Sequence, residues 1–212
     1  KPKPGNLYDL SYDDEIMARF AEAQGIVLPE LAADARKPWL DEQGLHDEFD
    51  AFQVEHWRER CRTLREQVDE LDPNFQFCIY PAPGTPFMVR AAYPEWATEA
   101  APIILADAST YGRPSRLREQ EEGLEINRQR LIERQQVAVE AGVPFIYTGG
   151  IDPAVTGADS EFSGKNAVAI SSVTDGYWIF YEGPSYETTH RDYFRWFTWA
   201  NEAITEGDLE AW

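Results

Sequence analysis

From about residue 48 onwards, the chain alternates between helical and strand patterns. Apolar residues recur every three or four positions from Glu48 to Leu71, which predicts a long helix that Asp72-Pro73 ends. Four apolar runs then follow, each with a helical pattern after it: "FQFCIYPAP", "APIILADAS", "VPFIYTGG" and "GYWIFYEGP". Continuous apolar runs are typical of parallel strands buried on both faces, and their alternation with helices predicts β/α units.

Residues 1–47 have a different pattern, which predicts an irregular helical lead-in. "SYDDEIMARFAEAQG" is helical, with Ser11 as the expected N-cap and Gly25 as the end. Prolines and a glycine break the rest of the segment. We therefore expect one domain over residues 1–212, with the lead-in at 1–47 and four strand–helix units at 48–212.

Two α/β architectures fit parallel β/α units of this number. One is the C-terminal half of a (β/α)8, or TIM, barrel, and the alternative is an open doubly wound parallel sheet. Gly149-Gly150 lacks the G-x-G-x-x-G context of a nucleotide-binding sheet. Half a barrel leaves two unpaired strand edges and an exposed inner face. The barrel interpretation therefore predicts a partner: an N-terminal barrel half from the same or another chain.

Charge and composition narrow the possible partners. The formal net charge is −19, which disfavours nucleic acid as a partner. No apolar run is long enough to span a membrane, so no membrane association is expected. The three histidines show no metal-ligand spacing, and neither a metal nor a cofactor is predicted. Cys61 and Cys78 are expected to be buried free thiols, with a single disulfide as the alternative.

The four predicted strand ends share a composition that suits sugar binding. They read "YPAPGTP", "ADASTYGRP", "YTGGIDPAVTG" and "YEGPSYETTH", so each has an aromatic residue and three have a carboxylate. In parallel β/α folds functional residues lie at the carboxyl ends of the strands. Aromatic rings stack on the apolar faces of sugars, and carboxylates accept hydrogen bonds from sugar hydroxyls.

Two carboxylates are the candidate catalytic residues. Asp107 ends an apolar strand and is a candidate general acid or nucleophile, since glycosidases use paired carboxylates. Glu182 follows "YWIFY" and is the second candidate. The alternative for Asp107 is loop capping, and for Glu182 a buried ion pair with an arginine. Trp178 is expected to pack in the core, and for Asp152 the alternative is turn formation. The candidate substrate-binding residues are Tyr80, Tyr111, Tyr147, Asp152, Tyr181 and His190.

The same motifs carry a resemblance to a known superfamily. "FCIYPAP", "PIILADAS", "PFIYTGGIDP", "DGYWIFYEGP" and "YFRWFTWANEAI" resemble the C-terminal half of glycoside-hydrolase-like (β/α)8 barrels from bacteria. The resemblance implies that Asp107 lies at the sixth strand end, the acid/base position in barrels similar to α-galactosidases. The seventh strand end, Tyr147-Thr148-Gly149, lacks the nucleophilic Glu of the large retaining clan.

Three functional hypotheses follow from these patterns. The first is a glycoside hydrolase, or hydrolase-like protein, acting on a polysaccharide or oligosaccharide. The second is a non-catalytic carbohydrate-binding or structural extracellular protein on a degenerate barrel, which the missing Glu motivates. The third, an open-sheet enzyme with a phosphorylated substrate, is disfavoured by the lack of a phosphate loop. A carbohydrate ligand favours an extracellular or periplasmic location.

Overall fold

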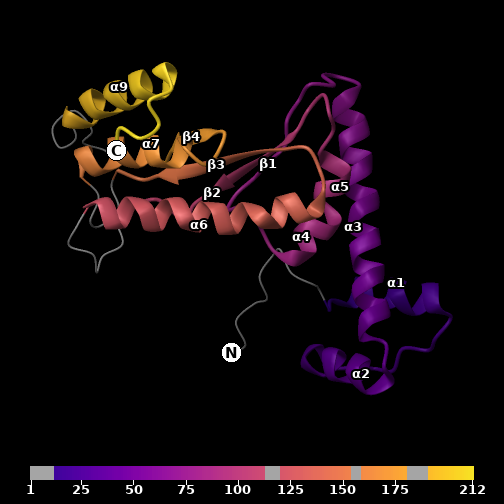
Figure 1. The fold of residues 1–212 in the computed structure, drawn as a ribbon. Helices are drawn as coiled ribbons and strands as arrows, with labels where there is room; N and C mark the ends of the chain where they lie inside the picture. Colours follow the sequence, from indigo (N-terminus) through magenta and orange to yellow (C-terminus); the bar gives the residue numbers. More distant parts are fainter. Residues whose placement is uncertain (1–11, 113–119, 154–158, 181–190) are drawn as a thin grey trace. The chain divides into compact units, whose positions relative to one another are not determined.

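The computed structural model describes residues 12–112, 120–153, 159–180 and 191–212 of the chain. The chain divides into two compact units (Figure 1). The first unit consists of Lys1–Phe75 and Thr85–Trp96, and the second of Gln76–Gly84 and Ala97–Trp212. The expectation of one domain stays a prediction, because compactness alone does not show whether the two units unfold together.

The described part of the first unit is helical. Asp13, rather than Ser11, caps its first helix: the Asp13 carboxylate accepts a hydrogen bond from the backbone N–H of Ile16 at 3.0 Å. Gly25 ends that helix in the left-handed conformation that glycine favours. The helices are α1 (Asp14–Gln24), a 3-10 turn (Ala33–Ala35), α2 (Arg36–Gln43), α3 (His46–Asp69), α4 (Pro86–Ala91) and α5 (Tyr93–Trp96).

Two groups of contacts hold the first unit together. The apolar core between α1, α2 and α3 consists of Ile16, Met17, Phe20, Leu40 and Phe49. Farther along α3, the short helices α4 and α5 pack against it. There the indole N–H of Trp96 donates to the Cys61 carbonyl at 3.2 Å, and Glu95 pairs with Arg58 and Arg62. The apolar stripe of residues 48–71 is therefore only partly buried: Phe49 and Cys61 pack in the unit, whereas Leu64 and Leu71 are exposed.

The second unit contains a four-stranded parallel sheet, which confirms the predicted parallel β/α fold class. The strands pair in sequential order, β1-β2-β3-β4. They are β1 (Cys78–Ile79), β2 (Ile103–Asp107), β3 (Phe145–Ile151) and β4 (Gly176–Ile179). The helices in the described part of this unit are α6 (Gln120–Ala141), α7 (Ser160–Ser171) and α9 (Arg191–Glu206). The first strand is much shorter than its apolar run, because only two of its residues pair with β2.

One face of the sheet, the helix face, carries the core. A Cβ on Gly149 of β3 would lie 2.7 Å from Ile170 of α7 and 3.0 Å from Leu131 of α6. On β4, the Tyr177 ring stacks on Phe197 of α9. The three helices therefore all contact this face. By strand alternation and register it also includes Ile79, Ile103, Leu105, Asp107, Tyr147 and Ile151, each at most 2% exposed.

The other face, the open face, carries the alternate residues of the same strands. They include Cys78, Ile104, Ile146, Thr148 and Trp178, all at least partly exposed. Both cysteines are free thiols. Cys61 is buried as expected, but the expectation of a buried Cys78 is wrong, because its side chain lies on this open face. No helix in the described residues is long and apolar enough to cross a membrane.

Candidate functional site

Four aromatic side chains gather where the strands of the second unit end. Tyr80 follows β1, Tyr111 lies in the loop after β2, and Trp178 and Phe180 come from β4 and its end. Trp178 meets Tyr80 and Tyr111 edge to face, with ring centroids 5.5 Å and 5.6 Å apart. Tyr111 stacks on Phe180 at 5.8 Å. We call these four residues the aromatic cluster.

The cluster also has polar groups that a ligand can use. The hydroxyls of Tyr80 and Tyr111 are hydrogen-bonded at 2.7 Å, and Tyr80 is 48% exposed. Burial, the bond to Tyr80 and nearby negative charge raise the pKa of Tyr111, so its phenol stays neutral at physiological pH. The indole N–H of Trp178 is buried and has no hydrogen-bond acceptor among the described residues. A buried donor without a partner costs free energy, so the aromatic packing around Trp178 is stabilised by ring contacts rather than by this N–H.

Glycine at position 150 lets the cluster form. A Cβ there would lie 2.6 Å from the Tyr111 ring, 2.8 Å from the Trp178 ring and 2.9 Å from the Asp107 carbonyl oxygen. Real Cβ atoms do not approach so closely, so any larger residue at Gly150 displaces the rings. This close packing ties the position of the aromatic cluster to the backbone of β3.

A buried polar network holds the loop that carries Tyr111. The Thr110 hydroxyl donates to the Gly150 carbonyl at 3.0 Å. Asn166 of α7 donates to the Thr110 carbonyl at 2.9 Å, and Asn127 of α6 donates to the Asn166 side-chain oxygen at 3.1 Å. All three side chains are fully buried. Buried and hydrogen-bonded in this way, they fix the loop to two helices and thereby position the Tyr111 ring.

Asp107 ends β2 as predicted, but its side chain points to the helix face and is fully buried. One carboxylate oxygen accepts hydrogen bonds from Arg134 Nε and the Tyr147 hydroxyl, both at 2.6 Å. The other accepts from the backbone N–H of Ser109 at 2.7 Å. Arg134 also donates to the Ala82 carbonyl at 2.6 Å. Asp107 therefore joins α6 to the segments after β1 and β2.

This geometry favours a structural role for Asp107 over general acid–base catalysis. A general acid or base needs to reach the substrate directly or through one water molecule. Both oxygens of Asp107 are occupied by protein donors, and the side chain has no exposed surface. Its catalytic assignment stays a prediction. The loop-capping alternative agrees with the bond from the Ser109 N–H.

The other predicted site residues separate into four groups. Tyr80 and Tyr111 come together in the aromatic cluster. Tyr147 is fully buried on the helix face, with its hydroxyl on Asp107, so it offers a sugar no surface. Asp152 is half-buried, and its backbone N–H donates to the Tyr111 carbonyl at 3.0 Å, which places it beside the cluster. The remaining candidates, Tyr181, Glu182 and His190, lie outside the described residues.

The structure adds residues to the site that the sequence pattern did not single out. Trp178 was expected in the core, but it is half-buried at the centre of the aromatic cluster. The sequence signal that could have found it is the alternation of side chains along β4, which puts Trp178 and Phe180 on the same face of the sheet. Arg134 had no such signal, because it is one of many charged residues in a long helix.

Comparison with protein-family models, with curated proteins and with solved structures gave no match for this chain. Among the described residues, no three His, Cys, Asp or Glu side chains gather where they could hold a metal ion.

Proposed function

We propose that the chain binds a carbohydrate at the aromatic cluster. The observation that carries this proposal is the convergence of Tyr80, Tyr111, Trp178 and Phe180 from different strand ends on one edge of a parallel sheet. Ligands of open α/β sheets and barrels bind at that edge. The ring faces suit the apolar faces of a sugar, and the phenol hydroxyls of Tyr80 and Tyr111 suit its hydroxyls.

The proposal includes a barrel-like setting for the site. In the described residues the strand order is sequential and α6, α7 and α9 contact one face, as around a (β/α)8 barrel. A doubly wound sheet instead reverses its strand order and is covered on both faces. Apolar residues on the open face suit the interior of a closed barrel. We therefore propose that further β/α units, from the same or another chain, pair with the edges of the sheet and cover the open face.

Non-catalytic binding is the form of the proposal that the geometry supports best, because Asp107 is buried and fully hydrogen-bonded. Hydrolysis is the second candidate, because the backbone of Asp107 lies next to Gly150 beside the cluster, although its carboxylate is on the helix face. It requires Asp107 to exchange its bond to Arg134 for one to the substrate. Incubation with the glycans that bind, followed by product analysis, distinguishes the two.

The test is a glycan-binding screen of the wild-type chain and two variants, followed by calorimetry on any hit. Tyr80→Ala removes an exposed ring from the cluster and is expected to abolish binding without unfolding the chain. Tyr177→Phe is the matched control, because Tyr177 lies on the helix face and its hydroxyl bonds Asn201 of α9 at 2.9 Å. Equal binding by the Tyr80→Ala chain would exclude the aromatic cluster as the site.

A further inference from the structure

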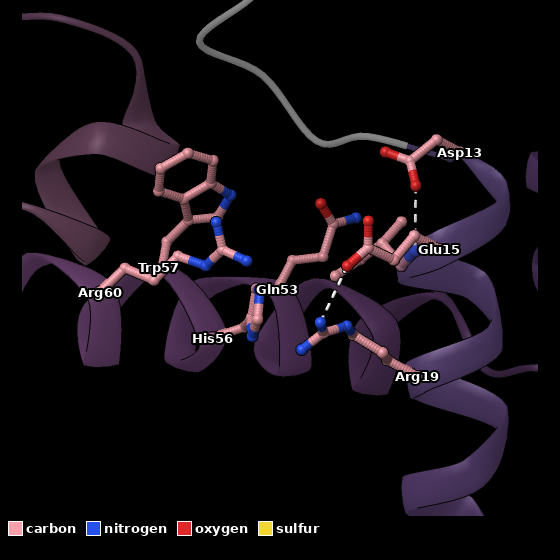
Figure 2. A pocket seen from close by; sticks show the side chains of 8 residues that line it. Asp13, Glu15, Arg19, Gln53, His56, Trp57 and Arg60 are labelled. Carbon is pink, nitrogen blue, oxygen red and sulfur yellow. Dashed lines mark hydrogen bonds and ion pairs between the residues drawn. The ribbon is translucent and has the colours of Figure 1, made fainter.

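A small pocket lies in the first unit, between the N-terminal turns of α1 and the middle of α3 (Figure 2). Its volume is about 150 Å³, which suits a single six-membered ring with a small substituent. It combines charged, amide, imidazole and indole groups from two helices that share the core of this unit. Its lining residues are Asp13, Glu15, Ile16, Arg19, Gln53, His56, Trp57 and Arg60.

Among the described residues that line the pocket, Arg60 is the cation without an ion pair. Arg19 pairs with Glu15 at 2.8 Å, and the Asp13 carboxylate caps α1 through the Ile16 N–H. Arg60 forms no ion pair with any described residue; its guanidinium lies 5.7 Å from the centre of the Trp57 ring. Trp57 is 44% exposed, so both groups of this pair can be reached from solvent.

The electrostatics at His56 support a positive local potential. Its ring stacks on Phe52 of the same helix, with centroids 6.2 Å apart. Burial lowers the pKa of His56, and the charges of Arg60 and Arg19 lower it further, while Glu59 and Glu15 act in the opposite direction. The net shift is downward, so the imidazole is neutral at physiological pH and can donate one N–H to a bound anion.

We propose that this pocket binds a singly charged carboxylate attached to a ring, with the carboxylate on Arg60 and the ring against Trp57. A guanidinium matches a carboxylate in a two-pronged geometry, and an indole face packs against a flat or apolar ring. One available cation suits a monoanion better than a doubly charged phosphate. The site lies in the unit without the sheet, so it is separate from the aromatic cluster and does not depend on the function proposed there.

The test follows the His56 ring by NMR during titrations with galacturonate, benzoate and glucose. Saturation with a bound carboxylate is expected to raise the pKa of His56, because a negative charge beside the imidazole favours its protonated form. Binding of galacturonate but not of benzoate would identify the ligand as an acidic sugar. Binding of benzoate but not of galacturonate would identify it as an aromatic acid. Either result supports the proposal. Binding of glucose as tight as that of both acids would overturn it.

Variants of α3 make the assignment specific. Arg60→Gln is expected to weaken binding of the acid about tenfold or more, because the bound carboxylate loses its charged hydrogen-bond donor. Arg62→Gln is the matched control, because Arg62 is on the same helix but pairs with Glu95 outside the pocket. Equal weakening by the two variants, or an unchanged His56 pKa at saturating galacturonate and benzoate, would refute the proposal. Arg60 is exposed, so its replacement is not expected to unfold the unit.

Discussion

At the scale of single residues, Asp107 shows that a carboxylate at a strand end need not face the ligand site. The sequence places it at the end of an apolar strand, where a catalytic carboxylate is common. In the structure its oxygens are bonded to Arg134, Tyr147 and the Ser109 N–H on the helix face. Among the described residues at the same strand ends, Tyr80 is the most exposed of the aromatic cluster, and Tyr111, Trp178 and Phe180 are half-buried.

Replacement of Asp107 by Asn tests this structural role. Arg134 then loses its anionic partner. The free energy of unfolding is expected to fall by about 2–3 kcal/mol. This is less than for a fully buried ion pair, because the Arg134 side chain is 39% exposed. Urea denaturation measures the change. Tyr147→Phe, which removes one of the three bonds, is expected to cost about 1 kcal/mol. Loss of glycan turnover in Asp107→Asn with unchanged stability would instead indicate an acid–base role.

The adjacent glycines of β3 offer a matched pair at the same scale. Gly150→Ala places a Cβ against Tyr111 and Trp178, and we expect glycan affinity to fall at least about tenfold, equivalent to 1.4 kcal/mol. Gly149→Ala crowds Ile170 and Leu131 on the opposite face and is expected to cost about 1–3 kcal/mol of stability. Calorimetry on the folded Gly149→Ala chain should show unchanged affinity. Affinity lost equally in both would contradict the assignment of the faces.

At the scale of elements, close helix packing organises the second unit. Helices α7 and α9 pack along each other (Figure 1). Gly164 of α7 is the contact point, since a Cβ there would lie 2.8 Å from both the Cβ and the carbonyl oxygen of Trp196. The carbonyl belongs to the backbone of α9 and cannot rotate away. Small residues in α7 thus determine how closely α9 approaches it.

Gly164→Ala is accordingly expected to push α9 away and to destabilise the second unit by about 1–3 kcal/mol. Gly142→Ala is the control, because Gly142 has a positive φ of 66° at the end of α6 but nothing within 4 Å of a new Cβ. It should cost about 1 kcal/mol through backbone strain alone. Thermal unfolding compares the stability of the two variants, and near-UV circular dichroism of the folded chains reports changes in aromatic packing, including that of Trp196.

In the first unit, an ion-pair network between α3 and α5 predicts a pH dependence. Burial alone would raise the pKa of Glu95, but the bonds from Arg62 and Arg58 outweigh it and lower the net value below 4.5. A lowered folded pKa contributes stability above the unfolded pKa, and this contribution is lost as the pH falls through the folded pKa. Glu95→Gln should therefore lower the urea midpoint at pH 7. The difference from the wild type should shrink below pH 4.5, and a constant difference down to pH 2 would exclude this origin.

At the scale of the whole molecule, the open face and the edges of the sheet are the features without a described partner in the second unit. Cys78 lies on that face, so its thiol reports whether further strands cover it. The Cys78 side chain is exposed, but burial of part of it still raises its pKa. In the isolated 212-residue chain we therefore expect Cys78 to react with a maleimide faster than Cys61. Cys61 is the internal control, since burial raises its pKa to about 11. Denatured intact mass distinguishes the 24.2 kDa chain from a longer one.

In a form that carries further β/α units, found by a larger mass or a co-purifying chain, Cys78 should be protected. Unchanged labelling of Cys78 in such a form would mean that the open face is not the inside of a barrel. Protection of Cys78 together with gain of glycan affinity would tie the site to a closed barrel.

The sequence by itself determined the alternation of strands and helices, the end of β2 at Asp107 and the aromatic character of the strand ends. These features are local: apolar runs, caps and turn residues act within a few positions. The face on which each side chain lies was decided only by the tertiary structure. Apolar runs are alike on both faces of a strand, so the sequence cannot show which face the helices cover. Their packing buries Asp107 and Tyr147 on one face and leaves Tyr80 and Trp178 partly exposed on the other.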